Sequence, residues 1–232
     1  MNLPNAITTA RIAVAPLIAT MALLPSAGYR SGAFALYIAA AVTDYWDGHL
    51  ARTRNLVTDL GRLLDPLADK LLLVATLVPM YLLQGAGDGW VPLGGLASDA
   101  PFAFLTPLGR VGLPWWVAAV VLGRELFMTV FRQLAARRGV IISAIGPAKW
   151  KTGFQSTWVG AAFFWFFAAT FAEQRGDGWQ GTAFTAWAYF NGVVGVVSMV
   201  VAVALTLYSM ALYLKRYGGV LKTADANVAA RR

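Results

Sequence analysis

Four aspartates lie at fixed spacing within a short stretch of a strongly apolar chain: Asp44, Asp47, Asp65 and Asp69. The stretch reads D-x-x-D-G-x-x-A-R, then eight residues, then G-x-x-x-D-x-x-x-D. Ionised carboxylates at the edge of a bilayer are costly unless a positive group is bound beside them. Oxygen ligands of this kind suit Mg²⁺ or Mn²⁺, and those ions suit phosphate chemistry. The pattern therefore predicts a metal-dependent phosphoryl-transfer site.

The spacing of these acids indicates two helical faces that meet. Asp44 and Asp47 are three residues apart, and Asp65 and Asp69 are four apart, so each pair shares one face of a helix. A short turn between the two helices would bring the faces together. Carboxylates at close range repel one another unless cations offset their charge. The alternative is a solvated face whose acids pair with nearby arginines, and the residues alone leave it open.

The composition is that of a membrane protein. The chain has 232 residues, of which 58% are hydrophobic and 13% are charged, whereas a soluble domain carries about 25% charged residues. Several apolar stretches approach the ~20 residues that a spanning helix needs. We therefore expect a single membrane domain over residues 1–232, with a flexible tail over residues 217–232. Cysteine is absent from the sequence, which excludes disulfides and thiolate metal sites.

The apolar stretches predict an all-α integral membrane protein with six transmembrane helices. They run over Thr8–Leu24, Gly32–Ala51, Pro66–Leu83, Pro114–Ala135, Thr152–Phe171 and Trp187–Leu214. Pro66 fits the first turn of the third helix, where a missing amide hydrogen costs nothing. The segment Gly85–Leu113 is rich in glycine and proline, and the sequence indicates no role for it.

The basic residues predict the orientation of the helices. The formal charge is +8, from 19 Lys and Arg against 11 Asp and Glu. Most of the basic residues follow the second, fourth and sixth apolar stretches, and loops of this kind stay in the cytoplasm. We therefore expect both termini and the four aspartates on the cytoplasmic side. No basic arm with interleaved aromatic residues occurs in the sequence, which argues against a nucleic-acid partner.

The stretch from Asp44 to Asp69 resembles the signature of the CDP-alcohol phosphatidyltransferase family at every specified position. The resemblance implies six helices around one or two Mg²⁺ or Mn²⁺ ions, which hold the diphosphate of a CDP-linked lipid, in a chain that forms a homodimer. It also implies that Asp44, Asp47 and Asp65 are metal ligands, and that Asp69 is the general base and a further metal ligand. The implied contacts with the CDP-lipid come from Gly48, Arg52, Thr58 and Gly61.

The first residues resemble the start of the bacterial phosphatidylglycerophosphate synthases within that family. The similar string is Asn2–Thr8, followed by Arg11. The resemblance implies that Pro4, Asn5 and Thr8 lie against the nucleotide end of the lipid donor. A simple helix start is the alternative, with Asn5 or Thr8 as the N-cap, and both interpretations are compatible.

A second segment resembles the same synthases, with an Arg124-Glu125 pair inside an apolar helix and a K-x-K-T string before the next helix. Arginine suits bidentate contacts with phosphate, and lysine supplies a point charge. We therefore predict a pocket for the phosphate of the acceptor, the alcohol that receives the phosphatidyl group. The pocket is formed by Arg124, Arg132, Lys149 and Lys151. The alternative is that Arg124 and Glu125 only pair with polar groups of neighbouring helices.

The predicted reaction transfers the phosphatidyl group from CDP-diacylglycerol to glycerol 3-phosphate and releases CMP, in a bacterial inner membrane. With phosphatidylglycerol as the acceptor, the product would instead be cardiolipin, and other alcohols used in the family are further alternatives. A transporter or cation channel is the alternative from another class. Channels place acids near the middle of the membrane, whereas these aspartates lie at predicted helix ends.

Overall fold

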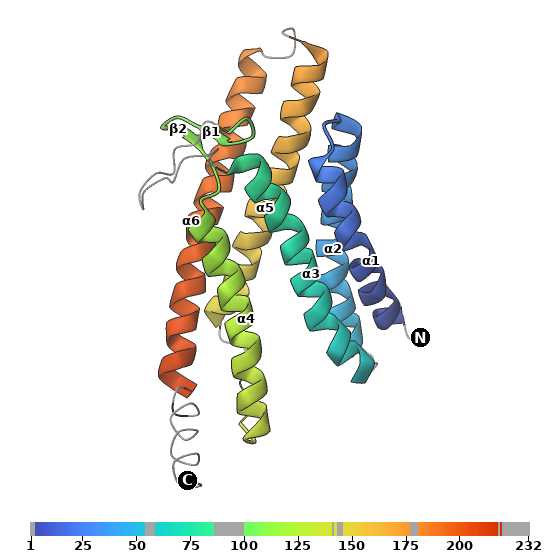
Figure 1. Cartoon of the computed structure of the whole chain (residues 1–232), viewed down its shortest axis with the longest axis vertical. Coiled ribbons are helices and arrows are strands. Elements are labelled where there is room, and N and C mark those ends of the chain that lie inside the picture. The colour runs from blue at the N-terminus through green and yellow to red at the C-terminus, as the bar shows by residue number, and fades with distance from the viewer. Residues whose placement is uncertain are drawn as a thin grey trace.

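The computed structural model describes residues 3–53, 59–85, 100–140, 142, 146–176, 181–217 and 219. It gives no side-chain placement for residues 3, 4, 45, 47–53, 59, 60, 62, 63 and 147–149. Within the described residues the chain forms six α-helices and one two-stranded antiparallel sheet (Figure 1). The helices are α1 (Leu3–Leu23), α2 (Ala27–Thr53), α3 (Asp59–Gln84), α4 (Trp115–Arg137), α5 (Gly146–Arg175) and α6 (Thr182–Tyr217), and the strands are β1 (Phe104–Thr106) and β2 (Gly109–Val111).

The helices are long enough to cross a bilayer. The shortest has 21 residues and the longest 36, and at about 1.5 Å of rise per residue even the shortest exceeds the ~30 Å of a hydrocarbon core. Among the described residues, three stretches combine this length with high hydropathy: Asn5–Leu23, Leu64–Gln84 and Thr182–Tyr217. The chain is therefore a helical membrane protein. That all six helices span the membrane, with both termini in the cytoplasm, stays a prediction.

Four of the six helices extend beyond their predicted bounds at both ends, α1 and α4 do so at one end only, and the largest correction concerns α3. Pro66 was expected in its first turn, but α3 begins at Asp59, so Pro66 lies well inside the helix. Asn5 and Thr8 are likewise inside α1, which begins at Leu3, so the N-cap interpretation is wrong. The cause is common to both cases, because hydropathy marks the apolar part of a helix and not the polar turns that continue it.

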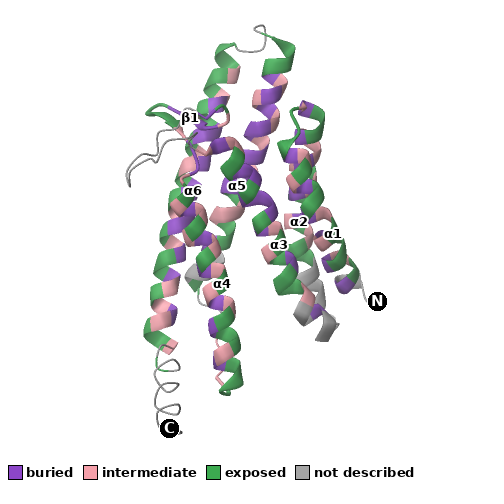
Figure 2. Cartoon of the chain, viewed as in Figure 1, coloured by how far each residue is buried: buried purple, intermediate pink, exposed green. Residues whose placement is uncertain are grey.

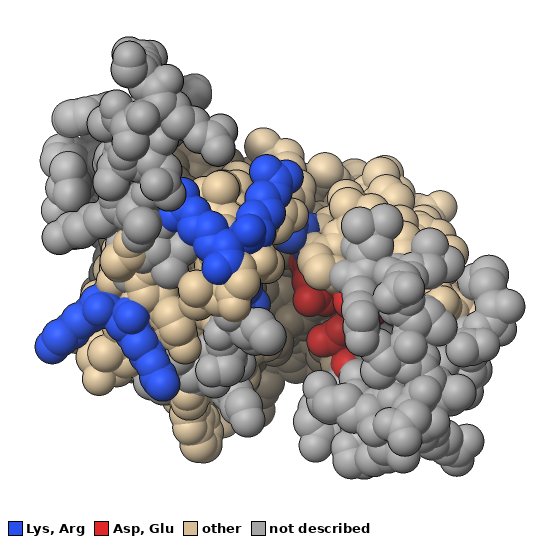
Figure 3. Space-filling model, turned by 90° about the horizontal axis from the view of Figure 1, so that it is seen from below, with Lys and Arg blue, Asp and Glu red and all other residues tan. Residues whose placement is uncertain are grey.

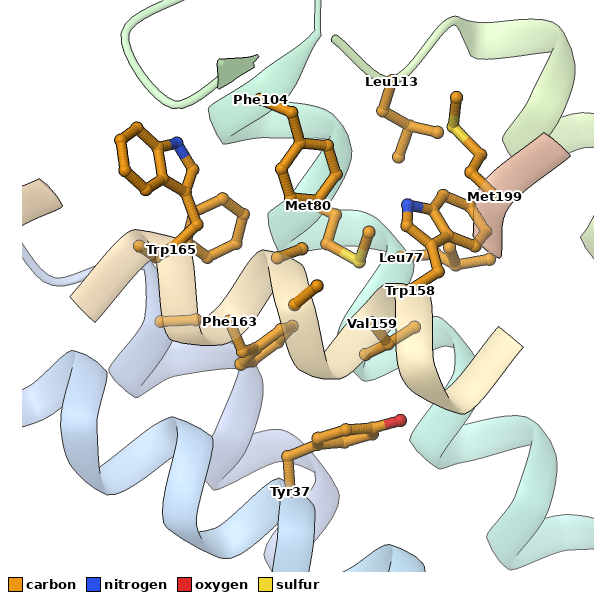
Figure 4. Close-up of a cluster of buried hydrophobic side chains, with 14 of the residues drawn as sticks. Tyr37, Leu77, Met80, Phe104, Leu113, Trp158, Val159, Phe163, Trp165 and Met199 are labelled. Atoms are coloured by element: carbon orange, nitrogen blue, oxygen red, sulfur yellow. The ribbon is translucent and has the colours of Figure 1, made fainter. Parts of the chain in front are cut away.

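The bundle is held together by a core of aromatic and aliphatic side chains centred on α5. Trp158 and Phe163 are fully buried there, against Tyr37 from α2 and Leu77 and Met80 from α3 (Figure 4). Helix α5 packs on α2 and α6, while α1 packs on α2 and α3. Figure 2 shows buried residues concentrated near the middle of α5 and the hairpin, whereas the lower parts of α4 and α6 are more exposed. The main core therefore packs the upper and middle parts of the bundle, and a smaller cluster of Met128, Phe131 and Tyr213 packs α4 against α6 below it.

A β-hairpin lies in the segment that the sequence left without a role, so the predicted all-α fold omitted this element. Strands β1 and β2 pair in register Phe104↔Val111, and Gly109 turns the chain with a φ of +118°. Strand β1 lies directly on α6. A Cβ atom at Gly192 would lie 1.8 Å from the Leu105 carbonyl oxygen, and one at Gly195 would lie 2.5 Å from the Phe104 ring. The two glycines of α6 therefore provide the close approach that seats the hairpin.

Arg30, near the start of α2, is buried at the end of the bundle where α1 ends. Its Nε donates to the Ala22 carbonyl oxygen at 3.2 Å, and its Nη1 donates to the Thr170 hydroxyl on α5. The guanidinium also lies over the Phe102 ring, 4.3 Å from its centroid. This arginine therefore joins α1, α2 and α5 through neutral partners.

Candidate active site

The predicted aspartates of α2 and α3 meet at α1, which packs against both helices. Thr8 of α1 donates its hydroxyl hydrogen to Asp65 Oδ1 at 2.8 Å. Arg11, one turn further along α1, donates its Nη1 hydrogens to Asp44 Oδ1 on α2 and, at 3.3 Å, to Asp69 Oδ1 on α3. We call Asp44, Asp65, Asp69, Thr8 and Arg11 the acid cluster. The predicted convergence of the two acidic faces is therefore present for these three aspartates.

The charges in the acid cluster are distributed unevenly between buried and exposed groups. The Arg11 side chain is only 4% exposed, while those of Asp44 and Asp69 are 47% and 60% exposed. The carboxylates thus surround a buried cation and still face the surface. From the sequence, Arg11 is part of the opening string only, and its contacts with Asp44 and Asp69 are not predicted. The signal was available, because a charged residue inside an apolar helix needs a partner.

The remaining predicted donor-site residues are tested only in part. Asn5 and Gly61 are both buried, on α1 and α3. Asp47, Gly48 and Arg52 belong to α2, but their side chains, like that of Pro4, lie outside the description, and Thr58 lies outside the described residues altogether. Their predicted contacts stay predictions.

The chemistry of the acid cluster fits a hard divalent cation. Among the side chains that the structure describes, no three His, Cys, Asp or Glu residues form a group that could enclose a metal ion. However, Asp44 and Asp69 come from different helices and already converge on one positive group. Their donors are carboxylate oxygens, which Mg²⁺ and Mn²⁺ prefer. The Arg11 guanidinium therefore marks a place where this fold gathers negative charge around a cation.

A basic cluster joins α4, α5 and α6, and we define it as Arg124, Lys151, Glu125 and Ser209. Glu125 Oε1 accepts hydrogen bonds from Arg124 Nη1 at 2.8 Å and from Lys151 Nζ. Arg124 Nη2 also donates to the Ser209 hydroxyl at 3.3 Å. Arg124 and Lys151 are both buried. The predicted pairing of Arg124 and Glu125 with polar groups is thus observed, and it brings two of the predicted acceptor-binding cations together.

The other two predicted acceptor-binding residues lie nearer the open end of the bundle. Arg132, two turns beyond Arg124 on α4, is exposed. Its Nη2 donates to the Tyr213 hydroxyl on α6 at 3.5 Å. Lys149 belongs to α5, and its side chain lies outside the description. Arg124 and Arg132 therefore form a row of positive charge along the contact between α4 and α6.

The acid cluster lies on α1, α2 and α3, the basic cluster lies on α4, α5 and α6, and a hollow opens at one end of the bundle. Seen from the end where α1 begins and α6 ends, the surface is recessed between a part that bears Asp side chains and a part that bears Lys and Arg side chains (Figure 3). The recess is open to the outside in this view. Such an arrangement can hold a polyanion, with a cation on the acidic side and a second anionic group on the basic side.

The profile of the CDP-alcohol phosphatidyltransferase family matches residues 1–208. The chain belongs to that family. The resemblance predicted from the aspartate motif is thereby confirmed.

Proteins similar to this chain come from several organisms. A "Probable phosphatidylglycerophosphate synthase" of Mycobacterium tuberculosis is 34% identical over 163 residues, which are 68% of this chain and 64% of the relative. A "CDP-diacylglycerol--glycerol-3-phosphate 3-phosphatidyltransferase" of Pseudomonas fluorescens is 30% identical over 226 residues, 96% of this chain and 93% of the relative. A "Cardiolipin synthase (CMP-forming)" of Oryza sativa is 32% identical over 162 residues, 68% of this chain and 44% of the relative. The chain thus spans less than two thirds of the mycobacterial and rice relatives.

Proposed function

We propose that this phosphatidyltransferase moves the phosphatidyl group from CDP-diacylglycerol to glycerol 3-phosphate, giving phosphatidylglycerophosphate and CMP. The observation that carries the proposal is that one helical bundle holds an acid cluster on α1, α2 and α3 and a basic cluster on α4, α5 and α6. The names of the mycobacterial and Pseudomonas relatives support the same reaction. Glycerol 3-phosphate carries a phosphate in addition to its reacting hydroxyl, so a buried Arg–Lys pair suits it.

The acid cluster would bind the diphosphate of the donor. In this proposal Asp44, Asp47, Asp65 and Asp69 hold one or two Mg²⁺ or Mn²⁺ ions. The chemistry that these ions supply when bound is neutralisation of charge on the diphosphate. The rest of the donor site would come from Pro4, Asn5, Thr8, Gly48, Arg52, Thr58 and Gly61. The hydrogen bond from Thr8 to Asp65 supports this grouping, because it ties the opening string to the aspartate motif.

The chemical step is a displacement at phosphorus. The hydroxyl oxygen of the acceptor attacks the phosphorus on the lipid side of the diphosphate. The bond from that phosphorus to the bridging oxygen breaks, and CMP leaves with the electron pair. Asp69 takes the proton of the attacking hydroxyl as the general base. Its exposed carboxylate and its position one turn along α3 from Asp65 support this role.

The basic cluster would bind the phosphate of the acceptor. Its contacts would come from Arg124, Arg132, Lys149 and Lys151, with the two arginines suited to bidentate hydrogen bonds. Arg124 and Lys151 already share Glu125, so their charges are held close together before any ligand arrives. Binding the acceptor by its phosphate would orient the hydroxyl toward Asp69 across the hollow, which lowers the entropic cost of the reaction.

We also propose that the enzyme works as a homodimer in a bacterial inner membrane, with the hollow facing the cytoplasm. The start of α1 and the end of α6 lie at the same end of the bundle as the acids (Figure 1). The excess of Lys and Arg in the segments at that end supports the cytoplasmic assignment. Water-soluble glycerol 3-phosphate is available on that side.

One experiment tests the reaction and its acceptor. Purified protein is supplied with CDP-diacylglycerol, Mg²⁺ or Mn²⁺, and labelled glycerol 3-phosphate or unlabelled phosphatidylglycerol. We expect the label to enter lipid and CMP to be released only with glycerol 3-phosphate and metal. Asp44→Asn serves as the inactive control.

The second candidate is cardiolipin synthesis, which the name of the rice relative favours. Release of CMP with phosphatidylglycerol but not with glycerol 3-phosphate would assign that reaction instead. The transporter alternative predicts no release of CMP with any acceptor, so release of CMP in the same assay would exclude it.

A further inference from the structure

Arg11 of α1 and Arg30 of α2 are both buried, but they bond to different kinds of partner. Both Arg11 and Arg30 have 4% of their surface exposed. Arg30 bonds to a carbonyl and a hydroxyl, which are neutral groups. Arg11 instead bonds to Asp44 and Asp69, from two helices. The partners of Arg11 are therefore two of the carboxylates that the proposed reaction needs for metal.

A guanidinium and a divalent ion cannot share these two carboxylates without cost. Asp44 Oδ1 and Asp69 Oδ1 both accept from the same nitrogen of Arg11, so the two oxygens already point at one positive group. A divalent ion that binds between them meets the like charge of the guanidinium at short range, where water screens it poorly. The hydrogen bonds to Arg11 must also break before the oxygens can turn to a metal. Arg11 and the metal are thus competitors for the same ligands.

We infer that Arg11 is the resident counter-cation of the acid cluster, which keeps the carboxylates together without metal and is exchanged for metal when the donor binds. The inference rests on the proposed function, since it assumes that Asp44 and Asp69 are metal ligands. It explains why the cluster contains a cation at all. Without one, the exposed carboxylates of α2 and α3 would repel one another and push the two helices apart.

The exchange links metal binding to donor binding. A buried guanidinium that loses its carboxylates is costly unless another anion replaces them. The diphosphate of the donor is the anion that the proposed reaction brings to this place. Metal alone must therefore displace Arg11 from these two carboxylates, whereas metal with the donor also provides a new anionic partner. By thermodynamic reciprocity, each ligand then tightens the binding of the other.

The test measures binding of Mn²⁺ to purified protein by the paramagnetic resonance signal of the free ion, so it needs no turnover. Without donor, we expect Arg11→Gln to bind Mn²⁺ roughly tenfold more tightly than the wild type, within the usual range of coupling effects. Arg30→Gln is the matched control, because it removes an equally buried charge at the other end of the bundle, and its affinity should equal that of the wild type. Added CDP-diacylglycerol should tighten Mn²⁺ binding in the wild type and much less in Arg11→Gln.

Thermal unfolding in EDTA gives a second measurement. We expect Arg11→Gln to unfold at a lower temperature than the wild type in EDTA and to recover with Mn²⁺. If Arg11→Gln does not fold, Arg11→Lys replaces it, because a lysine keeps the positive charge on a shorter, flexible side chain without the rigid guanidinium. An intermediate gain in Mn²⁺ affinity is then expected.

The possible contrary outcomes separate the two proposals. Equal or weaker binding of Mn²⁺ in Arg11→Gln, with measurable binding in the wild type, would overturn the exchange but leave the metal site standing. Absence of Mn²⁺ binding in every variant, with and without donor, would overturn the metal site and the exchange together. An equal gain in Arg30→Gln would show a general effect of lost charge and would also reject the exchange.

Discussion

The acid cluster and the basic cluster each contain one side chain of the opposite charge. This side chain is buried in the acid cluster but partly exposed in the basic cluster. In the acid cluster the single cation, Arg11, is buried, and the Asp44 and Asp69 carboxylates are exposed. In the basic cluster the cations are buried, and Glu125, their shared partner, keeps 27% of its side chain exposed. Both clusters retain an excess of one charge, negative in the first and positive in the second.

The difference shows how each half can accept a ligand. Exposed carboxylates around a buried cation can receive a metal ion from the hollow without moving their helices. Buried cations tied to one another by Glu125 are held in a fixed arrangement, which suits a ligand that must be oriented. The acid cluster is therefore suited to binding a cation, and the basic cluster is suited to orienting an anionic ligand. The following experiments test this contrast, from the largest expected effect on the reaction to the smallest.

The largest effect is expected for Asp69→Asn. The change removes the proposed base and one negative charge but preserves shape, so turnover should fall by about 10²–10⁴-fold, the usual contribution of a general base. Binding of CDP-diacylglycerol, followed by its effect on the unfolding temperature, should remain largely intact. Near-normal turnover would remove Asp69 as the base, and a loss of donor binding would make its role that of a metal ligand alone.

Arg124→Ala should act on the acceptor alone. Loss of a charged hydrogen bond costs about 1.5–3 kcal/mol, so the KM for glycerol 3-phosphate should rise about 10- to 100-fold. The KM for CDP-diacylglycerol should stay the same. Arg132→Ala is the control, because Arg132 is exposed and should raise the acceptor KM less. An equal rise in both KM values would give Arg124 a structural role only.

Glu125→Gln should lower the stability of the protein at the basic cluster and should not act on the chemical step. The amide keeps the shape but takes the shared negative charge from Arg124 and Lys151, so we expect a loss of about 1–3 kcal/mol in stability. The measurement is the unfolding temperature in nanodiscs. Glu173→Gln, the same change at an exposed acid of α5, should stay within about 0.5 kcal/mol of the wild type. Equal stability of both variants would contradict the assignment of Glu125 as the partner that fixes the two cations.

The smallest effect on the reaction is expected for Gly195→Ala, far from both clusters. The new methyl group would meet the Phe104 ring, and overpacking of this kind costs about 1–3 kcal/mol. The unfolding temperature should fall while both KM values remain those of the wild type. Gly153→Ala is the control, since nothing lies within 4 Å of a Cβ there. A changed acceptor KM in Gly195→Ala would mean that the hairpin influences the basic cluster.

The sequence predicted the helices and the acidic faces because both leave a local pattern. Runs of apolar residues identify a helix in lipid, and the spacing of Asp65 and Asp69 follows the helical repeat. The family resemblance followed from the same spacing. The hairpin left no such pattern, because its strands have three residues each and depend on contacts with glycines far along the chain.

Side-chain partners were harder to predict than elements. That Arg124 and Glu125 need partners followed from their place in an apolar helix, but that Lys151 and Ser209 provide them depends on how α4, α5 and α6 pack. Arg11 is likewise a charged residue inside an apolar helix, but the sequence did not identify its partners. In both cases the sequence identifies a charge that needs a partner and leaves the choice of partner to the packing.

By itself, the sequence determined that this is a helical membrane protein with a phosphatidyltransferase motif, because hydropathy and residue spacing are properties of the chain alone. Only the tertiary structure decided that Arg11 joins the acids of α2 and α3 and that Glu125 joins the cations of α4 and α5. The physical reason is that a charge in an apolar bundle must be paired, while the groups within its reach are set by which helices lie beside it.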